Sequence, residues 1–189
     1  MIADIAKKLY YSEIVFLDDD KTLDKCNGYS VVGTTSDIDN YQSYDFIVAI
    51  GNSEIRKKIQ NQLTNKDIDI VTLVHPNAVI GENVVLGEGT VVMAGAVINP
   101  CVTIGNGCII NTCASVDHDC VVGDFAHVSV GAHVAGTVTI GENTCIGAGA
   151  TVINNVNICG GCTIGAGSVV VKDITETGTY IGVPVKRLK

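Results

Sequence analysis

The chain has 189 residues, a formal net charge of −8 at pH 7 and a mean hydropathy of +0.35. The negative charge argues against a nucleic-acid partner, and no run of about 18 apolar residues indicates a membrane span. Charged residues at the N-terminus exclude a typical secretion signal. Eight cysteines in a chain of this length do not indicate a secreted disulfide framework, so we expect a cytoplasmic protein.

The first 73 residues alternate between helical and strand patterns. Helices are predicted at residues 3–11 and 53–64, with Ser53 as the N-cap of the second. Strands are predicted at residues 13–20, 29–35, 44–52 and 67–74. This alternation predicts a small α/β domain with a parallel sheet, which covers residues 1–73 and ends near His75.

A strict six-residue period follows. Aliphatic residues occupy every sixth position from Val74 to Val170, and a small or modest residue stands four places after most of them. Three such units form one triangular coil of about 18 residues, with the aliphatic side chains pointing inward. Each buried Val or Ile contributes about 1.5–3 kcal/mol to the common core. We therefore predict a parallel β-helix domain with a C-terminal tail over residues 74–189.

Basic residues are absent from this repeat. Between Val74 and Val171 there is no Lys or Arg, and the C-terminal cations are Lys172, Lys186, Arg187 and Lys189. If the β-helix binds a polyphosphate ligand, these four are its local cations. A solvated tail without a specific role is the simpler interpretation.

Three of the four histidines lie in the segment ASVDHDCVVGDFAHVSVGAHVAG. His118 stands between Asp117 and Asp119, two places after the inward Val116, and should face outward. A neighbouring carboxylate can orient an imidazole and support its basicity, which suits a general base. A surface histidine without a role is the alternative. Residues 18 apart stack, so Gly136 should lie beside His118 and leave room for a ligand.

The other histidines and the CGGC cysteines favour packing over metal or redox chemistry. His127 and His133 are six residues apart and should fall on different faces, so no three-ligand set is evident within one chain, although a set shared between subunits stays open. The CGGC sequence contains Cys159 and Cys162, but Cys162 occupies a small inward position, where a thiol packs as a small hydrophobe. We predict no metal.

Several longer segments carry a family resemblance. They are FLDDD (16–20), AIGNSEIRKKI (49–59), HPNAVIG (75–81), INTCASVDHDCVVGDFAHVSVGAHVAG (110–136) and IGVPVKRL (181–188). Together they resemble the sugar O-/N-acyltransferases of the hexapeptide-repeat superfamily, which include sialic acid O-acetyltransferases and PglD-type UDP-amino-sugar N-acetyltransferases. The segment VDHDCVVGDFAHVSVGA is specific to this group, whereas plain hexapeptide repeats are not.

The resemblance implies a left-handed β-helix, a homotrimer with active sites between adjacent β-helices, and acetyl-CoA as acetyl donor. His118 matches the catalytic base and Asp119 the acid that supports it. The residues that match cofactor contacts are His127, Gly136, Ala148 and Ala166, with Lys186 as a candidate for the cofactor phosphates. Asp18 and Asp19 match residues that hold the nucleotide sugar.

Family members open with a strand and a Gly-rich turn, whereas this sequence starts within the following helix. The resemblance therefore implies a Rossmann-like domain without its first strand, and we expect acetyl-CoA binding to be retained but sugar-nucleotide binding to be weakened. The expected activity is N-acetylation of a UDP-linked 4-amino-sugar. O-acetylation of a sialic acid-type sugar and a non-catalytic β-helix scaffold are the alternatives, and the identity of the sugar is open.

Overall fold

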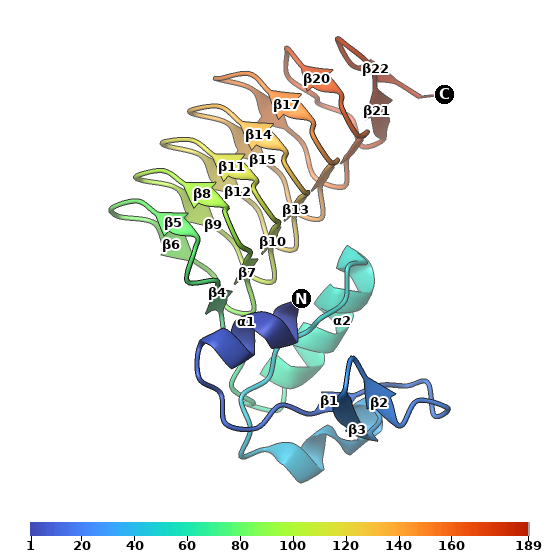
Figure 1. Cartoon of the computed structure of the whole chain (residues 1–189). Coiled ribbons are helices and arrows are strands. Elements are labelled where there is room, and N and C mark those ends of the chain that lie inside the picture. The colour runs from blue at the N-terminus through green and yellow to red at the C-terminus, as the bar shows by residue number, and fades with distance from the viewer. Residues whose placement is uncertain (189) are drawn as a thin grey trace.

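The six-residue period becomes three parallel sheets that wind upward coil by coil in the computed structural model, which describes residues 1–188 (Figure 1). The first sheet contains β4 (Leu73–Val74), β7 (Val91–Val92), β10 (Ile109–Ile110), β13 (His127–Val128), β16 (Cys145–Ile146), β19 (Thr163–Ile164), β21 (Thr179–Ile181) and β22 (Lys186–Arg187). The second contains β5 (Val79–Ile80), β8 (Val97–Ile98), β11 (Ser115–Val116), β14 (His133–Val134), β17 (Thr151–Val152) and β20 (Val169–Val170). The third contains β6 (Val85–Leu86), β9 (Thr103–Ile104), β12 (Val121–Val122), β15 (Thr139–Ile140) and β18 (Asn157–Ile158).

One coil takes 18 residues, as the pairing of Ile109 with His127 shows. In each strand from β4 to β20 the second residue is the predicted inward aliphatic, and from Val92 to Val170 these side chains are at most 2% exposed. The small residues of the period are buried with them, including Cys108, Cys120 and Cys162. The predicted inward column is therefore confirmed as one continuous core.

The last strands close the top of the first sheet. β21 pairs with β19 in parallel, and β22 folds back on β21 in an antiparallel hairpin. Lys186 and Arg187 therefore belong to a strand and not to a loose tail. Arg187 donates to the carboxylate of Glu176 and to the Thr177 carbonyl oxygen, the latter at 2.7 Å.

The N-terminal region holds α1 (Ile2–Lys8), β1 (Phe16–Leu17), β2 (Lys25–Cys26), β3 (Tyr29–Gly33), the 3₁₀ helix η1 (Thr35–Tyr41) and α2 (Ser53–Thr64). Both predicted helices are confirmed, and β1 pairs with β3 in parallel. The sheet is not purely parallel as predicted, because β2 and β3 form an antiparallel hairpin. None of the helices among residues 1–188 is long and apolar enough to cross a membrane.

Three strand predictions in this region were too long. The strand expected at 13–20 is limited to β1, because Asp18 and Asp20 accept the amides of residues two places later and turn the chain. The strands expected at 44–52 and 67–74 meet only at the Phe46–Ile70 bridge before β4 begins. Their apolar side chains still fill a core with Leu63 of α2.

The predicted N-cap of α2 was also wrong by one residue. Asn52 has extended backbone angles, and its side-chain oxygen accepts the Ile55 amide at 3.0 Å. Ser53 is the first helical residue. The helix starts where the chain leaves the turn at Gly51, so the polar side chain before Ser53 occupies the capping position.

The N-terminal region packs on the lower coils of the β-helix. Ile5 and Ala6 of α1 share a core with outward residues of the first sheet, such as Val91 and Ile109. α2 lies along the corner between the third and first sheets, where Gln60 donates to the Glu88 carbonyl oxygen at 2.9 Å. A helical turn rises about 5.4 Å and a coil about 4.8 Å, so successive turns of α2 can meet successive coils.

Arg56, one helical turn before Gln60, forms the centre of this contact. It is 1% exposed, and its guanidinium donates to four carbonyl oxygens, those of Ile50, Gly51, Gly107 and Phe125, at 2.6–3.0 Å. The group therefore joins α2 and the Gly51 turn to two coils. Burial lowers the pKa of Arg56 from its usual value.

Candidate active site

The His118–Asp119 pair lies in the turn after β11, at the corner between the second and third sheets. His118 Nδ1 and Asp119 Oδ2 are 2.8 Å apart, and more than half of each side chain is exposed. Asp117 holds the same turn from the other side, because its Oδ1 accepts the His118 amide at 2.8 Å and the Asn99 side chain at 2.7 Å. The predicted outward position of His118 is confirmed.

This arrangement prepares His118 as a base. When Nδ1–H donates to the Asp119 carboxylate, the neutral ring carries its free electron pair on Nε2. The hydrogen bond with Asp119 raises the pKa of His118 above its usual value, and the negative charges of Asp117 and Asp119 act in the same direction. A stronger base results, with one nitrogen held and the other available for proton transfer.

Gly136 stacks on His118, as the 18-residue arithmetic predicted, but the expected room for a ligand is absent. A Cβ at Gly136 would lie 2.6 Å from His118 Nε2 and 2.8 Å from Cε1. The imidazole itself fills the place of the missing side chain. Glycine at this position therefore fixes where the ring can rest, and a ligand must approach Nε2 from another side.

We expect the Gly136→Ala variant to lose any activity that depends on His118 as a base, while it keeps its stability. Gly136 has no left-handed backbone angle, so alanine adds no backbone strain, and its methyl group acts only by pushing the imidazole away. A displacement of about 1 Å at a catalytic group can cost about 100-fold in rate. Steady-state kinetics and a thermal melt would check this; a variant that melts normally and retains the full rate would contradict it.

His127 occupies a different environment on the first sheet. It is half-buried at the outward position of β13, and its Nε2 lies 3.0 Å from Asn111 Nδ2. Asn111 Oδ1 accepts the Thr112 amide at 2.8 Å, which directs its NH₂ group toward His127. Nε2 therefore accepts and Nδ1 carries the proton. Burial, followed by the charge of Arg56, lowers the pKa of His127, so the neutral ring can donate from Nδ1.

The other residues matched to the cofactor follow this same side of the β-helix. Ala148 and Ala166 are exposed, one coil apart, at the corner between the first and second sheets, and Lys186 lies in β22 at the top of the first sheet. Gly136 belongs instead with His118. The corner of a triangular coil between its second and third sides lies opposite its first side, so one chain does not bring His118 and His127 together. His133 is on the second sheet, on a different face from His127 as predicted.

Asp18 and Asp19 follow β1 in the N-terminal region. Asp19 Oδ1 accepts both the amide and the hydroxyl of Thr35, at 2.9 and 2.8 Å, and these bonds lower the pKa of Asp19. Asp18 Oδ1 accepts the Asp20 amide at 2.9 Å. Asp19 therefore orders the start of η1, whereas Asp18 shapes the turn after β1.

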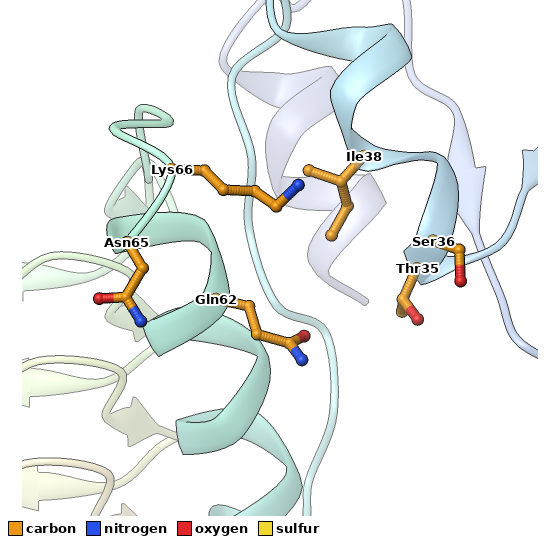
Figure 2. A pocket seen from close by; sticks show the side chains of 6 residues that line it. All are labelled: Thr35, Ser36, Ile38, Gln62, Asn65 and Lys66. Carbon is orange, nitrogen blue, oxygen red and sulfur yellow. The ribbon is translucent and has the colours of Figure 1, made fainter.

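A cavity of about 360 Å³ lies next to this turn. Figure 2 shows the side chain of Lys66, which follows α2, pointing toward Ile38 of η1. Its lining residues are Thr35, Ser36, Ile38, Gln62, Asn65 and Lys66. Lys66 is engaged there by Asp39, with Nζ 2.6 Å from Oδ2. No sequence pattern indicates this cavity, because the two segments that form it are distant in the chain.

Arg56 and Gln60 were also missed. Their four-residue spacing, with the buried Leu63 three residues further on, is the pattern of a buried helical face and could have found them. Within residues 1–188 there is no group of three His, Cys, Asp or Glu side chains that could hold a metal ion.

A hexapeptide-repeat β-helix with an exposed His–Asp pair is typical of the hexapeptide-repeat acyltransferases. The PglD N-terminal domain matches residues 1–63, and six bacterial transferase hexapeptide repeats match residues 119–154. The chain is 43% identical over 49 residues to UDP-N-acetylbacillosamine N-acetyltransferase of Bacillus subtilis, a segment that covers 26% of this chain and only 23% of that protein.

Solved structures match over nearly the whole chain. The acetyltransferase domain of PglB from Neisseria gonorrhoeae, in complex with acetyl coenzyme A, has a TM-score of 0.95 and 40% identity over 99% of this chain and 92% of that one. PerB from Caulobacter crescentus, in complex with CoA and GDP-perosamine, has a TM-score of 0.95 and 34% identity over 100% and 91%. The chain belongs to this family of hexapeptide-repeat sugar N-acetyltransferases with a PglD N-terminal domain. The predicted resemblance and left-handed parallel β-helix are confirmed.

Proposed function

We propose that the protein is a cytoplasmic enzyme that transfers the acetyl group of acetyl-CoA to the amine of a nucleotide-linked 4-amino-sugar. The observation that carries this function is the His118–Asp119 pair, with Nδ1 held at 2.8 Å and Nε2 available, on a chain of this family. Relatives named for UDP- and GDP-linked sugars are both similar to this chain, and we favour a UDP-linked substrate.

In this mechanism neutral His118 takes a proton through Nε2 as the amine attacks the thioester carbonyl. Asp119 stabilises the imidazolium that forms, and the same proton can pass to the departing thiolate of CoA. His127 donates from Nδ1 to the acetyl-CoA near its thioester. Residues 1–73 hold the sugar nucleotide, with Asp18 and Asp19 among the contacts, and residues 74–189 hold acetyl-CoA.

We also infer a homotrimer in which each active site lies between two chains. The support is geometric: His118 and Gly136 lie at one corner, whereas His127, Ala148, Ala166 and Lys186 follow the opposite side. The N-terminal region covers the lower part of that opposite side. A neighbouring chain that presents its His118 corner to this side would unite the base with both substrates.

Mixed trimers provide a direct test of a shared site. His118→Ala and His127→Ala chains, each impaired alone, would be refolded or expressed together. If the two residues act from different chains, about a quarter of the sites in random trimers contain both native histidines, and activity returns. Mixtures no more active than the separate variants would refute the shared site, as would a monomer mass by light scattering at micromolar concentration.

The substrate test measures CoA release with a thiol reagent. The chain would be offered acetyl-CoA with UDP- and GDP-linked 4-amino-sugars, with the same sugars bearing a hydroxyl at that position, and with a sialic acid. Turnover restricted to the amino-sugars supports the proposal. Turnover with the hydroxyl acceptors alone would replace it by O-acetylation, and a folded, trimeric protein that turns over none of them would point to a scaffold.

The Asp119→Asn variant should shift the pH dependence of the reaction. Asp119 raises the pKa of His118, so its removal lowers that pKa. Because the neutral ring is the active form, the acid limb of the kcat/KM profile should move to lower pH. The plateau of the profile should also be lower, because the carboxylate no longer orients the His118 ring. Rates measured between pH 5 and pH 9 would show the shift. An unmoved or upward-shifted acid limb would remove Asp119 from this role.

A further inference from the structure

Cys159 and Cys162 bracket the corner that joins β18 to β19. Their Sγ atoms lie 3.5 Å apart, in direct contact. Between them Gly160 and Gly161 form the turn, and Gly161 has a left-handed φ of 70°. The ends of a β-turn lie within about 7 Å of each other, and disulfide-bonded residues have Cα atoms about 4.4–6.8 Å apart. The backbone therefore already holds the two residues at a separation suited to a disulfide.

The two thiols differ in access. Cys162 is 1% exposed at the small inward position, and burial together with the contact to Cys159 raises its pKa to about 11. Cys159 is only half-buried where it packs against the core at the same corner. Cys159 is thus the thiol that a reagent from solvent meets first, and Cys162 is the thiol that stands behind it.

We propose that Cys159 and Cys162 form a dithiol site that small-molecule disulfides oxidise reversibly to a disulfide. The Cys159 thiolate attacks a sulfur of glutathione disulfide and expels one glutathione as its thiol. Cys162 then loses its proton, attacks Cys159 Sγ and expels the second glutathione. The protein gives up two electrons and two protons, and the small disulfide becomes two thiols.

The site lies beneath the hairpin of β21 and β22, which carries Lys186 and Arg187. The Gly160 carbonyl oxygen accepts the Thr177 hydroxyl at 2.8 Å, and the Thr177 carbonyl oxygen accepts Arg187 Nη2 at 2.7 Å. Disulfide formation shortens the Sγ–Sγ distance from 3.5 Å to about 2.05 Å and should displace the Gly160–Gly161 turn. The hydrogen bonds through Thr177 connect this turn to the hairpin. On the proposed function, where Lys186 meets the cofactor phosphates, oxidation should weaken acetyl-CoA binding.

The first test counts thiols and requires no enzyme activity. The reduced chain has eight cysteines, and incubation with glutathione disulfide should leave six titratable thiols under denaturing conditions, with recovery of all eight after dithiothreitol. Since no Lys or Arg lies between residues 74 and 171, thermolysin peptides would map the bond in place of tryptic ones. Retention of both thiols at Cys159 and Cys162, a lasting glutathione adduct on Cys159, or a bond from either residue to another cysteine would overturn the proposal.

Matched variants separate the pair from the other cysteines. Cys159→Ser and Cys162→Ala should both abolish the bond, and alanine is suited to position 162 because Ala114 and Ala132 occupy the equivalent inward position. Cys101→Ser, at an exposed cysteine on another corner, should still form it. In the wild type, oxidation should raise the KM for acetyl-CoA several-fold and dithiothreitol should reverse this. An unchanged KM in the oxidised protein would overturn the link to the hairpin, whereas absent turnover in the reduced protein would count against the proposed function alone.

Discussion

The His118→Ala variant is expected to lose about 10²- to 10⁴-fold in kcat, the usual contribution of a positioned general base. The substitution removes Nε2, the acceptor for the amine proton, and leaves the core untouched, because the His118 side chain is 58% exposed. Steady-state rates with acetyl-CoA and the amino-sugar acceptor would measure the loss. A melting temperature equal to that of the wild type would show that the variant is folded.

His133→Ala provides the matched control. His133 is also an exposed histidine with a polar neighbour, since its Nδ1 lies 2.8 Å from Ser115 Oγ. It belongs to the second sheet, and within residues 1–188 no carboxylate is hydrogen-bonded to it. We expect the His133→Ala variant to have a rate within about threefold of the wild type, because His133 is not the proposed general base. Equal losses in the two variants, or a His118→Ala variant with a near-normal rate, would remove His118 from the proposed mechanism.

The β-helix was predictable because the repeat permits a single register. A slip of one residue would turn Val116 and every other inward aliphatic toward solvent, so the period alone places His118 outside the core and stacks it on Gly136. The same arithmetic could not show that the imidazole itself fills the space at Gly136. That depends on a side-chain rotamer, set by the 2.8 Å contact with Asp119.

The N-terminal region was less predictable because its short strands depend on neighbours distant in the chain. Residues 44–52 have the apolar pattern of a strand, yet only Phe46 makes a bridge, to Ile70. Local turn bonds of Asp18 and Asp20 shorten β1, and such competition between side chain and backbone leaves no periodic signal. The burial of Arg56 was not expected because an arginine on a helix is normally solvated, and only its spacing to Gln60 and Leu63 indicated a buried face.

Arg56→Met is expected to be the most destabilising single substitution in the contact between α2 and the β-helix, with a loss of about 2–5 kcal/mol. Methionine fills much of the volume and removes the cost of burying a guanidinium, but it leaves the backbone acceptors in place. The carbonyl oxygens of Gly107 and Phe125 lose donors at 2.6 and 2.8 Å in a buried setting, and each such loss costs about 1–3 kcal/mol. The free-energy cost of the unpaired carbonyl oxygens should exceed the gain from no longer burying a charged guanidinium. The reason is that the substitution removes the donor but leaves the backbone acceptors in place.

The measurement can report on the N-terminal region separately. The chain has no tryptophan, and five of its six tyrosines lie within residues 1–73, so tyrosine fluorescence in urea follows chiefly that region. The neighbouring Lys57→Met variant is the control: its ammonium lies 3.1 Å from Glu142 and over the Phe125 ring, an exposed interaction worth at most about 1 kcal/mol. We expect a markedly lower urea midpoint for Arg56→Met and a small shift for Lys57→Met. Equal urea midpoints for the two variants would show that the four carbonyl contacts of Arg56 add no net stability. The N-terminal region would then be held mainly by the apolar contact of α1 with the first sheet.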